Sequence, residues 1–139
     1  MADEPLPVYG DGQNVRDWIF VTDHCRGVEL ALLHGASGEV YNFGGAAEKP
    51  NIEVVRTILS TLGKPESLIR FVTDRPGHDR RYAMDFSKAK RELGFTPAYD
   101  FTRGIKETMD WYRANGEWLE SVKSGAYRRF MDTWYGARA

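Results

Sequence analysis

The residues best suited to chemistry in this sequence stand in one short loop, residues 74–83. The loop reads Asp-Arg-Pro-Gly-His-Asp-Arg-Arg-Tyr-Ala, so three arginines and a histidine fall within seven residues. The Pro-Gly pair inside it breaks any helix or central strand. Arginine presents a planar fork of donors that matches phosphate oxygens in bidentate fashion. The loop is therefore predicted to bind an anion.

Other candidates for the same site stand far apart in the chain. Arg16 begins a predicted strand, and Asn51 opens a predicted helix whose N-terminal amides suit a phosphate. Residues at such ends can converge on one rim of an α/β layer. Two arginines and one amide would fit a diphosphate, and Tyr9 with Pro7 would fit a planar base. The predicted nucleotide-diphosphate site consists of Pro7, Tyr9, Arg16, Asn51, Arg75, His78 and Tyr135.

Several of these residues also have a purely structural explanation. Arg16 would form a surface salt bridge with a carboxylate such as Asp17 or Asp11, and Asn51 is a good N-cap. Tyr9 would cover the rim of the core. A salt-bridge network on a solvated face is therefore at least as consistent with the residue types as a ligand site.

The elements that position these residues follow from the hydrophobic pattern. Aromatic and β-branched runs predict strands at residues 16–21, 40–43 and 68–73. Helical spacing predicts helices at 23–33, 51–62 and 85–93, capped by Asp23, Asn51 and Asp85, and a last long helix that Asp100 or Thr102 caps and Asn115-Gly116 divides. Residues 126–139 are aromatic and basic, and we expect such a tail to pack on the domain or a partner. Residues 1–139 are predicted to form one α/β domain.

The composition argues against several classes of protein. A net charge of −1 provides no global basic field for nucleic acid. The one cysteine excludes an internal disulfide and fits a reducing compartment. We see no signal peptide, and no apolar run approaches the ~20 residues that span a bilayer, so a cytoplasmic protein without a membrane partner is expected. The three histidines lack metal-ligand spacing, so no metal is expected.

Several motifs resemble those of nucleotide-sugar enzymes. The runs Pro7-Val-Tyr-Gly-Asp-Gly, Asn14-Val-Arg-Asp-Trp-Ile-Phe-Val and Asp23-His-Cys-Arg are similar to the middle of an extended short-chain dehydrogenase. Tyr41-Asn-Phe-Gly-Gly with Glu48 and Asn51, the loop at 74–85, and Lys123-Ser-Gly-Ala-Tyr127 narrow the resemblance to the dTDP-glucose 4,6-dehydratase family. The resemblance covers nearly the whole chain.

The resemblance implies a role for each candidate residue. The implied roles are thymine contacts for Pro7 and Tyr9, diphosphate contacts for Arg16, Asn51, Arg75 and Tyr135, and a place beside the diphosphate and sugar for His78. Arg80 and Arg81 are expected only to brace the loop against carboxylates.

The resemblance also implies a reaction for which this sequence lacks the machinery. Family enzymes oxidise C4 of the sugar by hydride transfer to NAD, eliminate water across C5–C6, and return the hydride to C6. The glycine-rich NAD loop, the catalytic Tyr-x-x-x-Lys and a Thr-Asp-Glu segment have no counterpart here. We therefore expect no catalytic residue and no bound cofactor in this chain alone. The predicted fold is the C-terminal substrate-binding part of an extended short-chain dehydrogenase, short strands with about five helices, without the N-terminal Rossmann half.

The expected partners follow from the same comparison. The ligand would be a dTDP-sugar. Residues 16–43 would finish a large sheet whose other strands lie in the missing half, and exposed edges invite pairing. Self-association, or a separate chain that supplies the missing half, is therefore expected. The alternatives are a related nucleotide-sugar epimerase or dehydratase, and a non-catalytic module that binds a protein.

Overall fold

The computed structural model describes residues 3–125, which fall into two compact units. The units are Met1–Lys106 and Glu107–Ala139. The expectation that residues 1–139 form a single domain stays a prediction.

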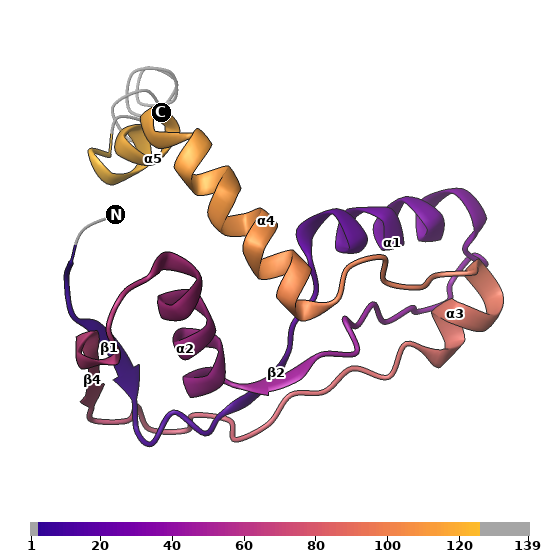
Figure 1. Ribbon diagram of the computed structural model, residues 1–139. Helices are drawn as coiled ribbons and strands as arrows, with labels where there is room; N and C mark the ends of the chain where they lie inside the picture. The colour runs from indigo at the N-terminus through magenta and orange to yellow at the C-terminus, as the bar shows by residue number, and fades with distance from the viewer. Residues whose placement is uncertain (1–2, 126–139) are drawn as a thin grey trace, which may run out of the picture. The chain divides into compact units, whose positions relative to one another are not determined.

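The strands of the first unit form two small sheets (Figure 1). Strands β1 (Leu6–Tyr9) and β4 (Ile69–Val72) pair in parallel, with Tyr9 opposite Val72. Strands β2 (Val15–Asp17) and β3 (Glu48–Pro50) pair antiparallel. Because parallel strands end at the same edge, the loops after β1 and β4 begin side by side.

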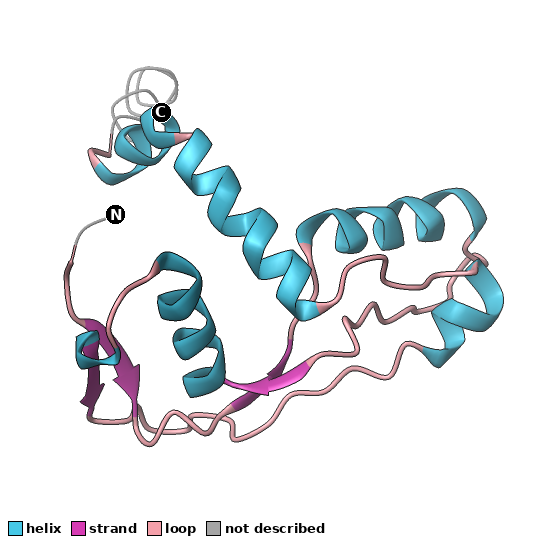
Figure 2. Ribbon diagram, viewed as in Figure 1, coloured by secondary structure: helices cyan, strands magenta, loops and turns pink. Residues whose placement is uncertain are grey.

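Five α-helices complete the described residues (Figure 2). They are α1 (Val21–His34), α2 (Asn51–Leu62), α3 (Ser87–Leu93), α4 (Phe101–Ala114) and α5 (Gly116–Lys123), and a 3₁₀ turn spans Glu66–Leu68. Helix α2 buries Ile52, Val54 and Leu59, and Val54 and Leu59 belong to the apolar face that its helical spacing predicts. It ends at Gly63, whose φ of 65° is the left-handed conformation typical of a helix C-terminus. The predicted α/β class with about five helices is confirmed.

Phe95, immediately after α3, is the centre of the larger core. It is fully buried, as is Ala89 of α3, and the nearly buried Leu93 packs with them. The rings of Phe43 and Phe86 pack on it with edge contacts, their centroids 4.9 and 5.8 Å from its own. This aromatic core ties α3 to the loop that precedes β3.

Two strand predictions need correction. Residues 40–43 are a loop, because no strand within residues 3–125 lies beside them to form a ladder. Residues 16–21 form a strand only as far as Asp17, after which the Trp18 N–H donates to Ala47 O at 3.1 Å. β-Branched and aromatic composition predicts a strand only where a partner exists.

The predicted caps at Asp23, Asn51 and Asp85 are also wrong by one to three residues. The residues at the N-cap positions of α1, α2 and α3 are Phe20, Pro50 and Phe86. Asp85 still accepts the Ser87 N–H at 2.8 Å, so it serves the first turn of α3 without being the cap residue. Asp100 accepts the Arg103 N–H at 2.8 Å at the start of α4, which decides between the two predicted caps of that helix.

Asp23 has a different task from capping. Its side chain is buried, with the residue 3% exposed, inside the first turn of α1. Oδ1 accepts the Ala98 N–H at 3.0 Å and Oδ2 accepts the Tyr99 N–H at 2.9 Å. The carboxylate therefore links α1 to the segment that leads into α4.

Candidate functional site

The cationic loop turns back on itself directly after β4. Pro76 and Gly77 occupy the centre of the turn, and Gly77 has φ = 69°, the positive value that the third position of a type II turn requires. The turn brings His78 Nδ1 to 2.6 Å from Asp74 Oδ1. It also places the His78 ring edge-on to Tyr9 at the end of β1, with centroids 6.3 Å apart.

The three arginines of the loop differ in what they contact. Arg80 Nη1 donates to Asp11 at 2.9 Å, and Arg81 Nη2 donates to Glu48 at 2.6 Å. The prediction that these two brace the loop against carboxylates is confirmed. The exposed Arg75 side chain makes no hydrogen bond or ion pair with any of residues 3–125. Arg75 is thus the arginine of this loop that can bind an anion without first losing a carboxylate.

Arg16 in β2 is held by backbone carbonyls. Its Nη1 donates to Val15 O at 2.6 Å and its Nη2 donates to Asp79 O at 3.0 Å. The guanidinium also lies over the Tyr82 ring, 4.6 Å from the centroid. These contacts join Arg16 to the far side of the cationic loop and orient its guanidinium.

Neither carboxylate proposed as a salt-bridge partner of Arg16 fills that role. Asp11 pairs with Arg80, and Asp17 accepts the backbone N–H groups of Gly45 and Ala47 at 3.1 and 2.9 Å. The structural explanation of Arg16 as half of a surface ion pair is therefore wrong.

Asn51 is likewise not explained by capping. Pro50 is the N-cap of α2, and the Asn51 side-chain amide makes no hydrogen bond within residues 3–125. Its backbone N–H donates to Asn14 O at 3.0 Å. The Asn51 amide consequently lies at the N-terminus of α2 with its hydrogen-bonding groups available to a ligand.

A cavity of about 290 Å³ brings three of the predicted residues together. Pro7, Tyr9 and Asn51 line it, and its remaining lining is apolar. The other lining residues are Val8, Trp18, Val54, Val55 and Ile58. A mostly apolar hollow with one amide and two flat rings suits a planar base.

Asn14 joins the cavity to the cationic loop, and the sequence interpretation did not identify it. The residue is 2% exposed, and its Nδ2 donates to Asp79 O at 3.1 Å while its backbone carbonyl accepts the Asn51 N–H. The neighbouring Val15 N–H donates to Arg80 O at 2.8 Å. Only its place between a glycine-rich turn and a strand could have indicated such a role.

The structure thus gathers six of the seven predicted site residues on adjoining segments. Pro7, Tyr9 and Asn51 share the cavity, His78 contacts Tyr9, and Arg16 and Arg75 belong to the segments that Asn14 joins. Tyr135 lies outside the described residues. The Asn51 amide therefore shares a cavity with the flat Tyr9 ring, and that ring contacts His78 of the cationic loop.

The loop carries two perturbed acidic groups. The hydrogen bond from His78 lowers the pKa of the Asp74 carboxyl below its ordinary value of 3.8. Because the folded value is the lower one, the stabilising effect of this pair is complete above 3.8 and is lost as the pH falls through the lowered value. The hydrogen bond that the Tyr82 hydroxyl donates to Asp79 raises the pKa of Tyr82.

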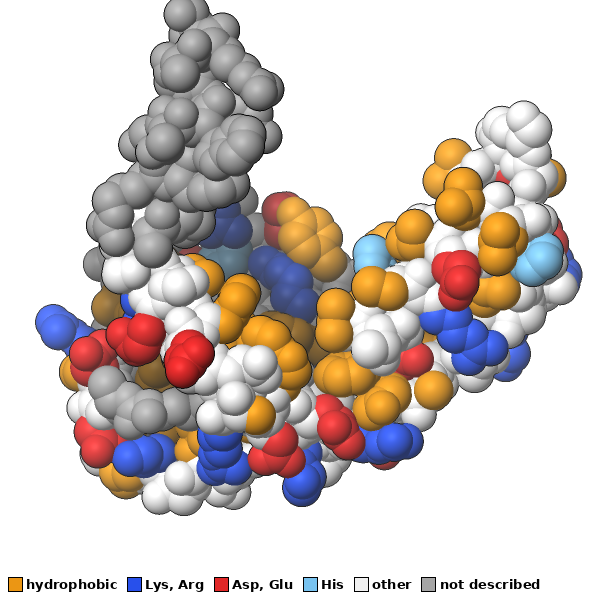
Figure 3. Space-filling model, turned by 90° about the horizontal axis from the view of Figure 1, so that it is seen from above, with side chains coloured by type: hydrophobic (Ala, Val, Ile, Leu, Met, Phe, Trp, Pro, Cys, Tyr) orange, Lys and Arg blue, Asp and Glu red, His pale blue; other side chains and the backbone are white. Residues whose placement is uncertain are grey.

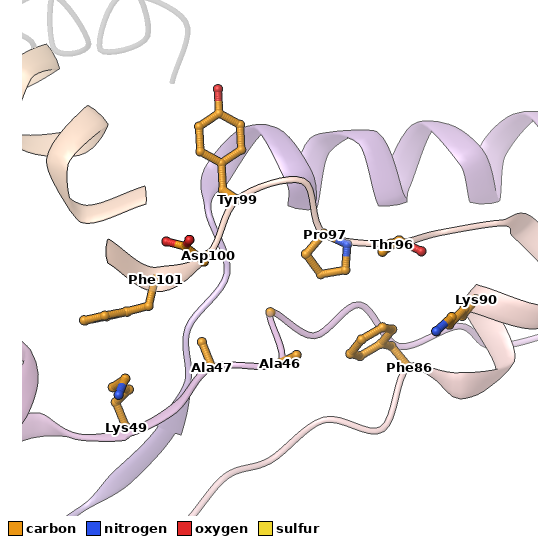
Figure 4. A pocket seen from close by; sticks show the side chains of 11 residues that line it. Ala46, Ala47, Lys49, Phe86, Lys90, Thr96, Pro97, Tyr99, Asp100 and Phe101 are labelled. Atoms are coloured by element: carbon orange, nitrogen blue, oxygen red, sulfur yellow. The ribbon is translucent and has the colours of Figure 1, made fainter. Parts of the chain in front are cut away.

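A second cavity, of about 410 Å³, lies between the loop before β3 and the start of α4 (Figure 4). Figure 4 shows Lys49 and Lys90 at opposite ends of it, with Phe86 and Pro97 between them. Lys49 Nζ is engaged by Glu53 at 2.5 Å. None of the predicted site residues lines this cavity.

The described residues hold neither a metal cluster nor a membrane-spanning helix. Within residues 3–125 no group of three or more His, Cys, Asp and Glu side chains could hold a metal ion. No helix of the described chain is long and apolar enough to cross a membrane.

Helix α1 presents an apolar face to solvent. Val21, Val28 and Leu32 recur at helical spacing and are 64%, 51% and 83% exposed. Leu33 and Val40 nearby are 64% and 76% exposed. Figure 3, which looks down on this helix, shows hydrophobic side chains gathered on it. The opposite side of α1, with Leu30 and Ala31, packs on the aromatic core instead.

Comparison with known proteins assigns this arrangement to a family. Residues 1–108 match the model of the family described as GDP-mannose 4,6 dehydratase, and the chain belongs to this family. The chain is 56% identical over 137 residues to dTDP-glucose 4,6-dehydratase of Xanthomonas campestris pv. campestris, covering 92% of this chain and 39% of the relative.

Solved structures support the same assignment. One is dTDP-glucose 4,6-dehydratase from Bacillus anthracis in complex with NAD, with a TM-score of 0.78 and 52% identity. Another is DesIV, a dTDP-glucose 4,6-dehydratase from Streptomyces venezuelae, with NAD and TYD bound, with a TM-score of 0.80 and 47% identity. Each match covers 83% of this chain and 36% of the other. The resemblance to dTDP-glucose 4,6-dehydratases is confirmed, and the chain spans about two fifths of the length of its curated relatives.

Proposed function

We propose that this chain is the nucleotide-sugar-binding part of a dTDP-glucose 4,6-dehydratase. The observation that carries the proposal is the shared cavity of Pro7, Tyr9 and Asn51, where the Tyr9 ring contacts His78 of the loop that also carries Arg75. Pro7 and Tyr9 would flank the thymine. Arg16, Asn51, Arg75 and Tyr135 would hold the diphosphate, with His78 beside it and the sugar.

The contacts of the described site residues favour binding of a dTDP-sugar. Arg16 is already oriented by two carbonyls and the Tyr82 ring, so little side-chain freedom is lost when it meets a phosphate. The side chains of Arg75 and Asn51 have no competing hydrogen bonds within residues 3–125. The apolar cavity wall removes the base from water while these donors receive the charge.

Binding of dTDP tests this proposal directly. Titration calorimetry of the purified 139-residue chain should give a saturable heat with dTDP and a weaker one with thymidine, which lacks the diphosphate. The alternative function, a non-catalytic module that binds a protein, is supported by the exposed apolar face of α1. That alternative predicts no dTDP binding, so a flat titration would favour it.

The residues of this chain do not fit NAD. Gly10 and Gly12 follow β1, but they lead into β2 and not into a helix whose N-terminal amides could receive a pyrophosphate. NAD supplies the hydride chemistry in the family enzymes, and neither the Tyr-x-x-x-Lys nor the glycine-rich loop occurs in this sequence. The role of this chain is accordingly to bind and orient the dTDP-sugar.

We predict that the chain alone has no dehydratase activity. Purified chain incubated with dTDP-glucose and NAD should form no dTDP-4-keto-6-deoxyglucose above the buffer background. A full-length relative assayed in parallel controls for substrate and detection. Turnover above background that persists through repurification of the chain would overturn this prediction.

We propose further that the exposed face of α1 binds the part of the family enzyme that this chain does not span. An apolar face of this kind gains free energy when it is removed from water. In the absence of that part, the chain should self-associate. The proposed cellular location is the cytoplasm, as the single cysteine suggests.

The oligomeric state tests the role of α1. Light scattering should show the wild-type chain larger than a monomer, and the double substitution Val28→Glu with Leu32→Glu should shift it toward the monomer. The double substitution Ser60→Glu with Ser121→Glu adds the same two negative charges at exposed positions of α2 and α5, so it serves as the control and should leave the association unchanged. A strictly monomeric wild-type chain with a two-state melt would contradict the proposal.

A further inference from the structure

The carboxylate of Asp74 is hydrogen-bonded through one oxygen and lies against the backbone of Gly10 with the other. Oδ1 accepts the Arg75 N–H at 2.9 Å and lies 2.6 Å from His78 Nδ1. Oδ2 lies against Gly10, where an added Cβ would stand only 2.7 Å from it. Gly10 also has φ = 58°, a left-handed conformation that favours glycine. Position 10 therefore requires glycine both for its backbone conformation and for the space that Asp74 occupies.

The His78 ring is restrained on more than one side. Its side chain is 7% exposed although it belongs to a surface loop. Asp74 engages Nδ1, and Tyr9 packs edge-on against the ring. The structure shows no hydrogen-bond partner for Nε2 within residues 3–125.

We propose that Asp74 is a positioning residue: by accepting the Nδ1 hydrogen, its carboxylate leaves Nε2 of His78 as the ring nitrogen that meets a nucleoside diphosphate. The inference rests on the proposed function of the site. A histidine ring has two distinct nitrogens, and the hydrogen bond at one determines the role of the other. Without Asp74 the neutral ring could carry its hydrogen on either nitrogen.

A proton transfer follows from this arrangement. Phosphate oxygens in the diphosphate accept hydrogen bonds, so Nε2 must carry a hydrogen when it binds one. A ring that is neutral before binding, with its hydrogen on Nδ1, therefore takes up one proton from solvent at Nε2. The resulting positive ring lies between two anions, the Asp74 carboxylate and the diphosphate, which stabilise it.

The charged and titratable groups around His78 come from two elements. Asp74 and Arg75 stand on its own loop, and Tyr9 stands at the end of β1. Arg80 pairs with Asp11, and its pKa is raised by that bond first and by Asp74 to a lesser extent. Asp74 is the only one of these carboxylates that the structure places in contact with the His78 ring among residues 3–125.

The tautomer of the ligand-free chain provides the first test. Long-range ¹H–¹⁵N correlation on histidine-labelled chain should show His78 with its hydrogen on Nδ1 above pH 8, and His78→Gln identifies the signal. Asp74→Asn should convert it to a mixture of tautomers. Asp79→Asn is the matched control, because Asp79 binds the Tyr82 hydroxyl in the same loop, and it should leave the His78 signal unchanged.

Proton uptake provides the second test. Calorimetry of dTDP binding at pH 8, repeated in buffers of different ionisation enthalpy, should show proton uptake for the wild-type chain. Asp74→Asn should abolish the uptake and weaken dTDP roughly tenfold, the change expected when a charged partner becomes neutral. Asp79→Asn should keep the uptake.

The outcomes separate this inference from the proposed function. If dTDP does not bind at all, the proposed function fails, while the tautomer of the ligand-free chain still decides whether Asp74 positions His78. If dTDP binds and Asp74→Asn retains both the wild-type affinity and the proton uptake, the positioning role is overturned. An unchanged His78 tautomer in Asp74→Asn would overturn it equally.

Discussion

Replacing Asp23 with alanine should lower the free energy of unfolding by about 3–6 kcal/mol, since each hydrogen bond to a charged acceptor contributes about 1.5–3 kcal/mol. The residue is 3% exposed and receives the N–H groups of Ala98 and Tyr99. Alanine would leave both N–H groups without an acceptor in a partly buried position. A domain of this size is stable by only about 5–15 kcal/mol, so the loss would be a large part of the total.

Urea denaturation followed by circular dichroism measures this effect. Asp23→Asn retains one acceptor oxygen and should give an intermediate loss. Glu29→Ala removes an exposed carboxylate from the same helix and should change stability by less than about 0.5 kcal/mol. Equal stability of Asp23→Ala and Glu29→Ala would show that the link between α1 and the segment before α4 contributes nothing.

Replacing Arg75 with alanine should weaken dTDP binding by roughly 1.5–3 kcal/mol, about 10- to 150-fold in Kd. Arg75 is exposed, and its guanidinium makes no hydrogen bond or ion pair within residues 3–125, so its hydrogen bonds to a diphosphate would not replace existing ones. Arg75→Lys keeps the charge but loses the planar fork, and its affinity should be intermediate. Calorimetry at a fixed ionic strength measures all three.

Arg81 provides the matched control for this prediction. It carries the same charge in the same loop, but its guanidinium donates to Glu48. An exposed ion pair of this kind contributes about 0–1 kcal/mol, so Arg81→Ala should weaken dTDP much less than Arg75→Ala. Equal losses of dTDP affinity in the two variants would mean that the affinity depends only on the net charge of the loop.

Local patterns in the sequence predicted the limits of several helices and strands. They failed where the structure of a segment depends on pairing or packing with residues far away in the sequence. The helix at 51–62 and the strand around 69–72 are close to their predicted limits, because apolar spacing and glycine stops are local signals. Residues 40–43 have strand composition but no neighbouring strand within residues 3–125. The face of α1 with Val28 and Leu32 has core composition but is exposed, because burial depends on what packs against a helix.

The sequence by itself determined that Asp74–Ala83 is a sharply turned cationic loop, and its motifs indicated the family. Residue types and turn chemistry are local, so they can be read without coordinates. Only the tertiary structure decided which arginines are used for bracing, that Asp74 contacts His78, and that Pro7, Tyr9 and Asn51 line one cavity. Those facts depend on the parallel pairing of β1 with β4 and on the hydrogen bond from Asn14 to Asp79, each of which joins segments more than sixty residues apart.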